Sequence, residues 1–267
     1  MPLPQLKDSV IDIEFFMRWI SSNRDLTYVE ADDQGTMVKI YPTNRIRIPV
    51  NKENVLKSGI VKPEDADLIL PYIDIEIDPQ AIGKNSIMML DIIANNNWER
   101  PIYFTGGANA DLEYIWMKDY LQLDGLSYRL VPIKTPVTTN LFDLGRIDSD
   151  HMYEIMMNWD WERMDYTKIY IDPETKKNSI SMRNNFMRLA EQYLREGDSI
   201  KANQVLDFSL EKLPITPFGH YGIALGYPQY YYLAGNREKA RETAQELIGL
   251  FQDRLKYYSI FDSSYIP

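Results

Sequence analysis

Hydrophobic residues recur along the first part of the chain with two different periods, which indicate alternating helices and strands. Apolar positions three or four residues apart predict a helix, and apolar positions two apart predict a half-buried strand. Helices are predicted over 10–20, 51–56, 86–94, 111–123 and 148–159. Strands are predicted over 26–31, 36–41, 45–50, 68–79, 100–105 and 126–133.

Polar residues and turn residues set the expected ends of these segments. Residues able to cap a helix precede three of the predicted helices, namely Asp8 or Ser9, Asn51 and Asp111. The helix at 86–94 is expected to be buried, with Met88 and Ile92 among its apolar residues. It leads through an Asn-rich turn into the strand at 100–105, an order typical of α/β layers. Residues 1–175 are therefore predicted to form an α/β or α+β sandwich domain with a mixed sheet.

The C-terminal third contains an internal repeat. Three positions recur 38 residues later: Tyr193 as Tyr231, Gly197 as Gly235, and Ala202 as Ala240. The first unit also follows tetratricopeptide spacing, with Phe186, Leu189, Ala190, Tyr193, Gly197, Ala202, Leu206 and Pro214. In that motif the small residues let two antiparallel helices approach each other. The usual period is about 34 residues, so a longer loop near 215–220 is expected between the two hairpins.

Residues 176–267 are thus predicted to form an all-α domain of tetratricopeptide-like helical hairpins. The boundary is expected within 173–180, because 172–178 is polar and carries turn residues, and 164–172 is predicted to be a linker or hairpin. Two repeats are fewer than the roughly three that stand alone. Either the hairpins pack on the first domain, or residues 251–260 form a closing helix.

Composition excludes several classes of site. The net charge of −10 argues against a large nucleic-acid interface, which needs a basic surface. The chain has no cysteine and two histidines, so thiol chemistry and a zinc site with three histidines are excluded. No signal-peptide pattern and no window of about 18 apolar residues is present, so we expect a soluble chain or the soluble part of a larger protein.

Three carboxylates form the first candidate site. Asp74, Glu76 and Asp78 alternate with isoleucines, which places them about 7 Å apart on one face of a strand. That spacing suits paired-carboxylate hydrolysis or a hard cation. The alternative interpretation is the solvated face of a strand whose isoleucines point into the core.

The Asn-rich turn is the second candidate. Asn97, Trp98 and Arg100 bring amide groups, an aromatic face and a guanidinium to one turn, which could hold a sugar or a peptide. The alternative is a helix end stopped by Asn, with Trp98 packed in the core and Arg100 paired to a carboxylate.

Other motifs give weaker signals. Residues 105–108 (TGGA) lack a complete phosphate-binding pattern, and no Gly-x-Ser-x-Gly is present. His151 is expected on a helix surface and His220 in the long repeat loop.

Tyrosines cluster at Tyr227, Tyr230, Tyr231, Tyr232, Tyr257 and Tyr258. Some, with Tyr227 and Tyr230 as candidates, are expected to line a concave peptide-binding surface, whereas Tyr231 fits the repeat core. No metal or cofactor is predicted.

Four strings resemble a known family. They are 12–16 (DIEFF), 71–77 (PYIDIEI), 95–104 (NNNWERPIYF) and 119–133 (DYLQLDGLSYRLVPI). Together with the repeats that follow, they resemble the C-terminal region of a bacterial multi-pass membrane family formerly catalogued as a domain of unknown function. That family is similar to transmembrane protein O-mannosyltransferases, which use lipid-linked sugar donors.

The resemblance implies an accessory role. The family's catalytic acidic residue lies in a loop between transmembrane helices, which has no counterpart here, so no catalytic residue is carried over. The resemblance implies an extracytoplasmic, periplasmic, non-catalytic domain, which would dock on the membrane-embedded part of the same polypeptide and bind an acceptor protein or partner. Two alternatives stay open: an independent carbohydrate-active hydrolase using Asp74, Glu76 or Asp78, and a stand-alone protein-interaction module.

Overall fold

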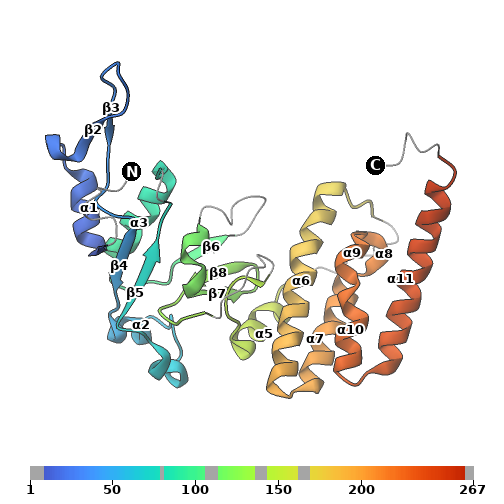
Figure 1. Ribbon diagram of the computed structural model, residues 1–267. Coiled ribbons are helices and arrows are strands. Elements are labelled where there is room, and N and C mark those ends of the chain that lie inside the picture. Colours follow the sequence, from blue (N-terminus) through green and yellow to red (C-terminus); the bar gives the residue numbers. More distant parts are fainter. Residues whose placement is uncertain (1–8, 79–80, 106–113, 136–142, 162–168, 262–267) are drawn as a thin grey trace. The chain divides into compact units, whose positions relative to one another are not determined.

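The computed structural model describes residues 9–78, 81–105, 114–135, 143–161 and 169–261 (Figure 1). Its internal contacts divide the chain into two compact units. One unit runs to Leu123 and resumes over Ser127–Arg146, and the other combines Asp124–Leu126 with the chain from Ile147 onward. The second unit therefore includes the helix that precedes the repeats, whereas the division into 1–175 and 176–267 stays a prediction.

A mixed three-stranded sheet lies in the first unit. Strand β4 (Arg45–Pro49) runs parallel to β1 (Val10–Asp12) and antiparallel to β5 (Tyr72–Glu76). Ile46 lies opposite Ile75, and Ile48 lies opposite Ile73. All four isoleucines are buried, which confirms that the alternating pattern reflects one buried face.

Helices and a second sheet complete the first unit. Helices α1 (Ile13–Ser21) and α3 (Lys84–Asn96) bury Phe16, Leu90 and Ile93 in the same core. The second sheet contains β6 (Tyr103–Thr105), β7 (Leu121–Asp124) and β8 (Ser127–Leu130) in the order β6-β8-β7. A separate hairpin contains β2 (Tyr28–Glu30) and β3 (Met37–Lys39). The remaining elements are α2 (Lys52–Lys57) and 3-10 helices at Asp25–Thr27, Pro63–Leu68 and Ile115–Tyr120.

Three predictions in the first unit are corrected. The first helix begins at Ile13 with Asp12 as its cap, because residues 10–12 pair with β4. The helix predicted over 111–123 is a 3-10 helix over Ile115–Tyr120 rather than an α-helix, and it ends early because Leu121–Asp124 forms strand β7. Asp111 lies outside the described residues. Helix α3 forms as predicted, but Met88 and Ile92 are 64% and 56% exposed rather than buried.

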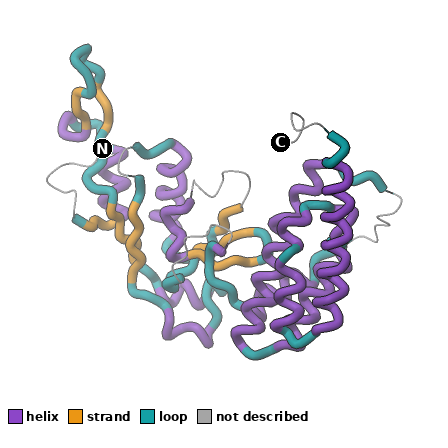
Figure 2. The backbone as a smooth tube through the Cα atoms, turned by 45° about the vertical axis from the view of Figure 1, so that its right-hand side comes forward, coloured by secondary structure: helices purple, strands orange, loops and turns teal. Residues whose placement is uncertain are grey.

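The second unit is helical, as predicted for the C-terminal region. Helix α5 (Ser149–Met157) precedes the paired helices α6 (Pro173–Glu196) and α7 (Ser199–Lys212). The second pair is α10 (Gly226–Leu233) and α11 (Arg237–Tyr258), and the short helices α8 (Ile215–Phe218) and α9 (Tyr221–Ala224) lie between the pairs. Figure 2 shows these helices packed side by side.

Equivalent repeat positions have equivalent environments. Tyr193 and Tyr231 are both buried, and Ala202 in α7 and Ala240 in α11 are also buried. Gly197 and Gly235 end their helices at φ values of 85° and 80°. This left-handed conformation favours glycine, so the recurring glycine makes the turn in each hairpin.

Two predictions in the second unit are corrected. The segment 173–180 is not a turn but the start of α6, with Asp172 as N-cap and Pro173 in the first helical turn. Proline suits that position because its missing N–H needs no partner there. Residues 251–258 continue α11 rather than forming a separate closing helix. Across the described residues, no helix combines the length and apolar character needed to cross a membrane.

Candidate binding groove

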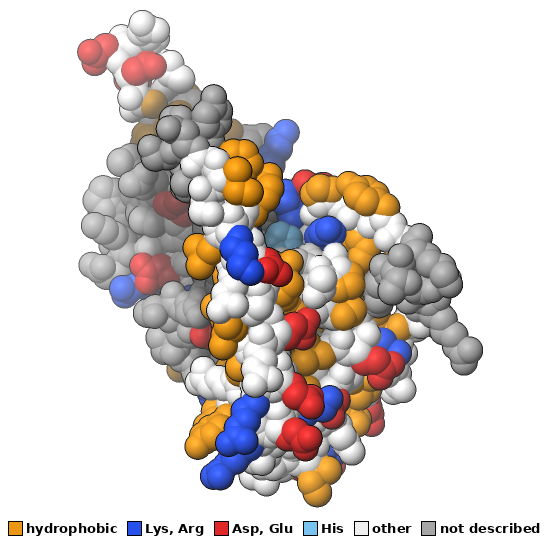
Figure 3. All heavy atoms as spheres, turned by 90° about the vertical axis from the view of Figure 1, so that its right-hand side faces the viewer, with side chains coloured by type: hydrophobic (Ala, Val, Ile, Leu, Met, Phe, Trp, Pro, Cys, Tyr) orange, Lys and Arg blue, Asp and Glu red, His pale blue; other side chains and the backbone are white. Residues whose placement is uncertain are grey.

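An open groove of about 610 Å³ lies within the second unit. Its walls come from the first turns of α6, the chain around α8 and α9, and the last turns of α11. In Figure 3 this face of the C-terminal helices shows Lys and Arg side chains gathered around a recess that also holds a histidine. We call it the α6–α11 groove, and its volume is typical of ligand sites.

Arg183 holds one wall of the groove in place. Its side chain is fully buried, and its Nε and Nη2 donate to the Leu213 carbonyl at 3.2 and 3.1 Å. Nη2 also donates to the Pro214 carbonyl at 2.8 Å, and Nη1 to the Gly219 carbonyl at 2.7 Å. Burial lowers the pKa of Arg183, yet an arginine pKa starts so high that the group stays cationic. His220, which follows Gly219, has a φ of 49°, so the chain turns sharply at this point in the groove wall.

Aromatic rings make up much of the groove surface. Tyr221 packs edge-to-face on Phe251 with ring centres 6.1 Å apart, and Tyr257 packs similarly on Tyr258 at 5.6 Å. Phe218 is buried beneath, with the Arg183 guanidinium 5.8 Å from its ring centre. Such rings offer apolar contact area at a small cost in side-chain entropy.

The groove is locally cationic. Lys176, Lys177 and Arg254 line it together with Asp253 as the carboxylate. Lys177 pairs with Glu174 at 2.8 Å, and Asp253 pairs with Lys256 at 3.4 Å. Within the described ranges, neither Lys176 nor Arg254 forms an ion pair. Arg254 lies over the Tyr258 ring at 5.7 Å. Two cations thus remain available to a ligand, in a protein whose net charge is −10.

The Asn-rich turn has a structural role in the first unit. Asn97 and Trp98 adopt φ values of 49° and 59°, so the chain reverses left-handed at the end of α3. The Trp98 Nε1 donates to the Pro49 carbonyl at 2.8 Å, and the Asn54 side chain donates to the Asn97 carbonyl at 2.9 Å. Trp98 is therefore the predicted packing anchor.

Little room for a ligand exists beside this turn. The cavity next to Trp98 measures about 10 Å³, which admits one water at most. Arg100 is exposed and, in the described part of the chain, forms no ion pair with a carboxylate. The expected pairing of Arg100 is thus not seen there.

The carboxylates of β5 pair with arginines across the sheet. Arg47 donates to both oxygens of Asp74 at 2.8 and 2.7 Å, and its guanidinium stacks 3.6 Å from the Tyr72 ring centre. Glu76 accepts from Asn44 at 3.0 Å and lies 3.8 Å from Arg45. These side chains lie on an exposed sheet face rather than in a pocket. Among the described residues, no group of three or more His, Asp and Glu could hold a metal ion.

The candidate tyrosines separate into core and groove. Tyr227 is fully buried with its hydroxyl 2.5 Å from Ser209 Oγ, and Tyr231 is buried and donates to Asp207 at 2.7 Å. Tyr230 is half-buried and donates to Glu191 at 3.3 Å. Tyr257 and Tyr258, by contrast, line the α6–α11 groove.

Sequence reasoning did not single out the cations of this groove. Lys176 and Lys177 stood in a segment interpreted as a turn, and Arg254 lay in the segment 251–260, which was considered only as a possible closing helix. The one available signal was the extra length at 215–220, which supplies a wall of the groove.

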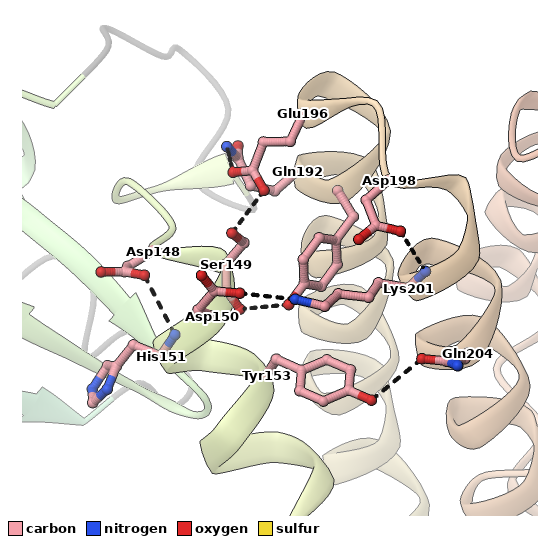
Figure 4. A network of polar contacts seen from close by, with 11 residues as sticks. Asp148, Ser149, Asp150, His151, Tyr153, Gln192, Glu196, Asp198, Lys201 and Gln204 are labelled. Carbon is pink, nitrogen blue, oxygen red and sulfur yellow. Dashed lines mark hydrogen bonds and ion pairs between the residues drawn. The ribbon is translucent and has the colours of Figure 1, made fainter.

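A polar network fixes α5 to α6 and α7 (Figure 4). Lys201 pairs with Asp150 at 2.9 Å, Tyr193 donates to the Ser149 carbonyl at 3.1 Å, and the Ser149 hydroxyl donates to Glu196 at 2.7 Å. Burial raises the pKa of Tyr193 to about 12. These mutual pairings are those of a structural contact between helices.

A second polar pair involves the other histidine. His151 Nε2 lies 3.4 Å from Asp124 Oδ2, and the histidine is half-exposed on α5, as expected from sequence.

Comparison with known proteins gives one match. Residues 4–151 match the family model described as TMEM260-associated domain 2, which covers more than half of the chain. The searches of curated proteins and of solved structures found no match.

Proposed function

The chain belongs to the TMEM260-associated domain 2 family, and we propose that it is a non-catalytic accessory domain of a membrane-bound glycosyltransferase. The observation that carries this proposal is the family match over 4–151, because the family is associated with TMEM260-type mannosyltransferases. A catalytic role for the chain itself has little support, since its most suggestive carboxylates are paired with arginines on an open sheet face.

The finer parts of the proposal concern place and partners. The domain would lie on the extracytoplasmic, periplasmic face of a bacterial membrane and contact the membrane-embedded part of the same polypeptide. The helical region would act as tetratricopeptide-like hairpins that bind an acceptor protein or partner. The repeated Tyr-Gly-Ala positions and their matching burial support that reading.

Two other functions make different predictions. An independent hydrolase using Asp74 would need that carboxylate free at a substrate pocket, but Asp74 accepts two hydrogen bonds from Arg47. A stand-alone interaction module would need no membrane partner, and the α6–α11 groove is compatible with it. The two binding hypotheses differ in whether a glycosyltransferase accompanies the chain.

Cross-linking from native membranes tests the proposal. After cross-linking, an antibody to the chain would precipitate it together with any protein that is cross-linked to it. Mass spectrometry would then identify the precipitated polypeptides from their peptides. We expect a multi-pass glycosyltransferase among them, and we expect the isolated chain neither to transfer nor to hydrolyse sugar. Steady turnover by the isolated chain, or recovery without any membrane transferase, would refute the proposal.

A further inference from the structure

We infer that the α6–α11 groove binds an extended acidic segment of a partner protein. The inference rests on the proposed function in that it names the chemistry of the partner. It commits to a peptide that carries carboxylates and intervening apolar side chains.

Charge complementarity supplies the first step. Lys176 and Arg254 stand on opposite walls of the groove, one on α6 and the other on α11, and neither is paired with a carboxylate in the described part of the chain. An arginine fork binds a carboxylate through two parallel hydrogen bonds, and a lysine adds a point charge. A segment with acidic residues on both sides would satisfy both cations at once.

The aromatic walls supply the second step. Tyr257 is 58% exposed, and Tyr221 and Tyr258 are half-buried beside it, so ring surface remains accessible within the groove. Apolar side chains that alternate with the carboxylates would contact these rings. A binding site that combines rigid aromatic anchors with cations selects both parts of such a segment.

The overall charge favours a peptide over a charged surface. The chain carries a net charge of −10, so an anionic membrane or a nucleic acid would be repelled by most of the protein. An extended segment in the groove meets three cations, Lys176, Lys177 and Arg254, against one carboxylate, Asp253. The groove is open to solvent, which suits a segment that lies in it in an extended form.

Fluorescence anisotropy of the full chain tests the inference. The probe is a fluorescein-labelled peptide of about ten residues in which Glu and Leu alternate, and the reference probe replaces each Glu with Gln. We expect the acidic probe to bind, the Gln probe to bind at least about tenfold more weakly, and added salt to weaken the acidic probe.

Matched variants locate the binding. The double variant Lys176→Gln, Arg254→Gln is expected to weaken the acidic probe by about tenfold or more. The double variant Lys57→Gln, Arg241→Gln removes the same charge from exposed positions outside the groove lining and should stay within about twofold. Tyr257→Ala, at an exposed position, should weaken both probes. Circular dichroism verifies that each variant is folded.

Several outcomes would overturn the inference. They are no binding of the acidic probe, equal affinity for the Gln probe, or equal losses in the two double variants. Binding of phosphatidylserine vesicles that Lys176→Gln, Arg254→Gln abolishes, without peptide binding, would assign the groove to lipid. Cross-linking to a glycosyltransferase with no peptide binding refutes this inference alone. Peptide binding without any transferase partner refutes the proposed function alone.

Discussion

At the scale of single residues, a few side chains hold together segments that are distant in sequence. Trp98 bonds to the end of β4 from the end of α3, and Arg183 binds three carbonyls that lie 30 to 36 residues away. In each case a side-chain N–H that is buried or partly buried satisfies a main-chain carbonyl, and a buried polar group is costly to leave unpaired. These residues therefore have a structural role, which is to hold neighbouring segments of the main chain in place.

Replacement of Arg183 by Met should be strongly destabilising. The variant leaves the Leu213, Pro214 and Gly219 carbonyls without their buried donor. We expect a loss of about 3 kcal/mol in the free energy of unfolding, measured by urea titration. Arg195→Met is the control, because Arg195 is exposed on the same helix and pairs with Glu191. Its loss should stay below about 1 kcal/mol, and equal losses would contradict the assigned role.

At the scale of elements, glycines determine where helices end and where the chain turns between strands. Glycines in left-handed conformations close both repeat hairpins and the turn between β7 and β8. The space around them differs, since Gly197 and Gly235 are open whereas Gly125 is enclosed. The energetic effect of a substitution should follow that difference.

Gly125→Ala should therefore cost more stability than Gly235→Ala. Both positions have positive φ, at 67° and 80°, so each variant carries backbone strain of about 1 kcal/mol. At Gly125 the added Cβ would also lie 2.9 Å from Trp159 and 3.0 Å from Ile155, whereas nothing lies within 4 Å at Gly235. We expect an additional loss of about 1–3 kcal/mol for Gly125→Ala in thermal unfolding. Similar losses of stability for the two variants would show that the contacts of the added Cβ with Trp159 and Ile155 do not destabilise the protein.

The start of α6 should respond to acid. Hydrogen bonds from the Thr175 side chain and from the Thr175 and Glu174 backbone lower the pKa of Asp172 below its usual value of 3.8. Because the folded state holds the lower pKa, the stabilisation is present above pH 3.8 and is lost as pH falls through that lower pKa. The Thr175 amide resonance should shift in that acidic range. Asp172→Asn keeps a capping side chain but should abolish the shift, and persistence of the shift would assign it to another group.

Much of the fold could be predicted from the sequence, and the errors have identifiable causes. The alternation in 45–50 and 73–77 is strong because one strand face is buried, and the repeat glycines mark real turns. Residues 173–180 were misread because Pro173 signals a turn by composition, yet in this context it starts a helix. The groove could not be predicted, because it joins three segments that are far apart in the sequence, at 173–177, 218–221 and 250–258, and only packing brings them together.

At the scale of the whole molecule, buried tyrosines link stability to alkaline pH. Burial raises the pKa of Tyr41, Tyr193 and Tyr227 to about 12, and burial with the Asp207 hydrogen bond raises the pKa of Tyr231. The folded state thus favours the neutral phenol beyond the unfolded value near 10. This stabilisation is complete below about pH 10 and is lost as pH rises through 12.

An absorbance titration at alkaline pH measures this effect. Of the 19 tyrosines, the four named groups should ionise late in the folded protein, and the late phase should disappear in denaturant. Tyr227→Phe should reduce the amplitude of the late phase, whereas Tyr170→Phe, at a site 85% exposed, should leave it unchanged. A single transition near pH 10 in the folded protein would contradict the prediction.

The buried guanidinium of Arg183 has a consequence for folding cooperativity. In a simple helical array, each hairpin contacts its neighbour through helix faces, and the end hairpin can open by itself. Here a side chain of the first hairpin is bonded to the connecting segment that leads into the second. Opening the second hairpin then disturbs a buried charge in the first. The two hairpins are coupled into one cooperative unit, so that the groove, which takes walls from both α6 and α11, forms and is lost together with both hairpins.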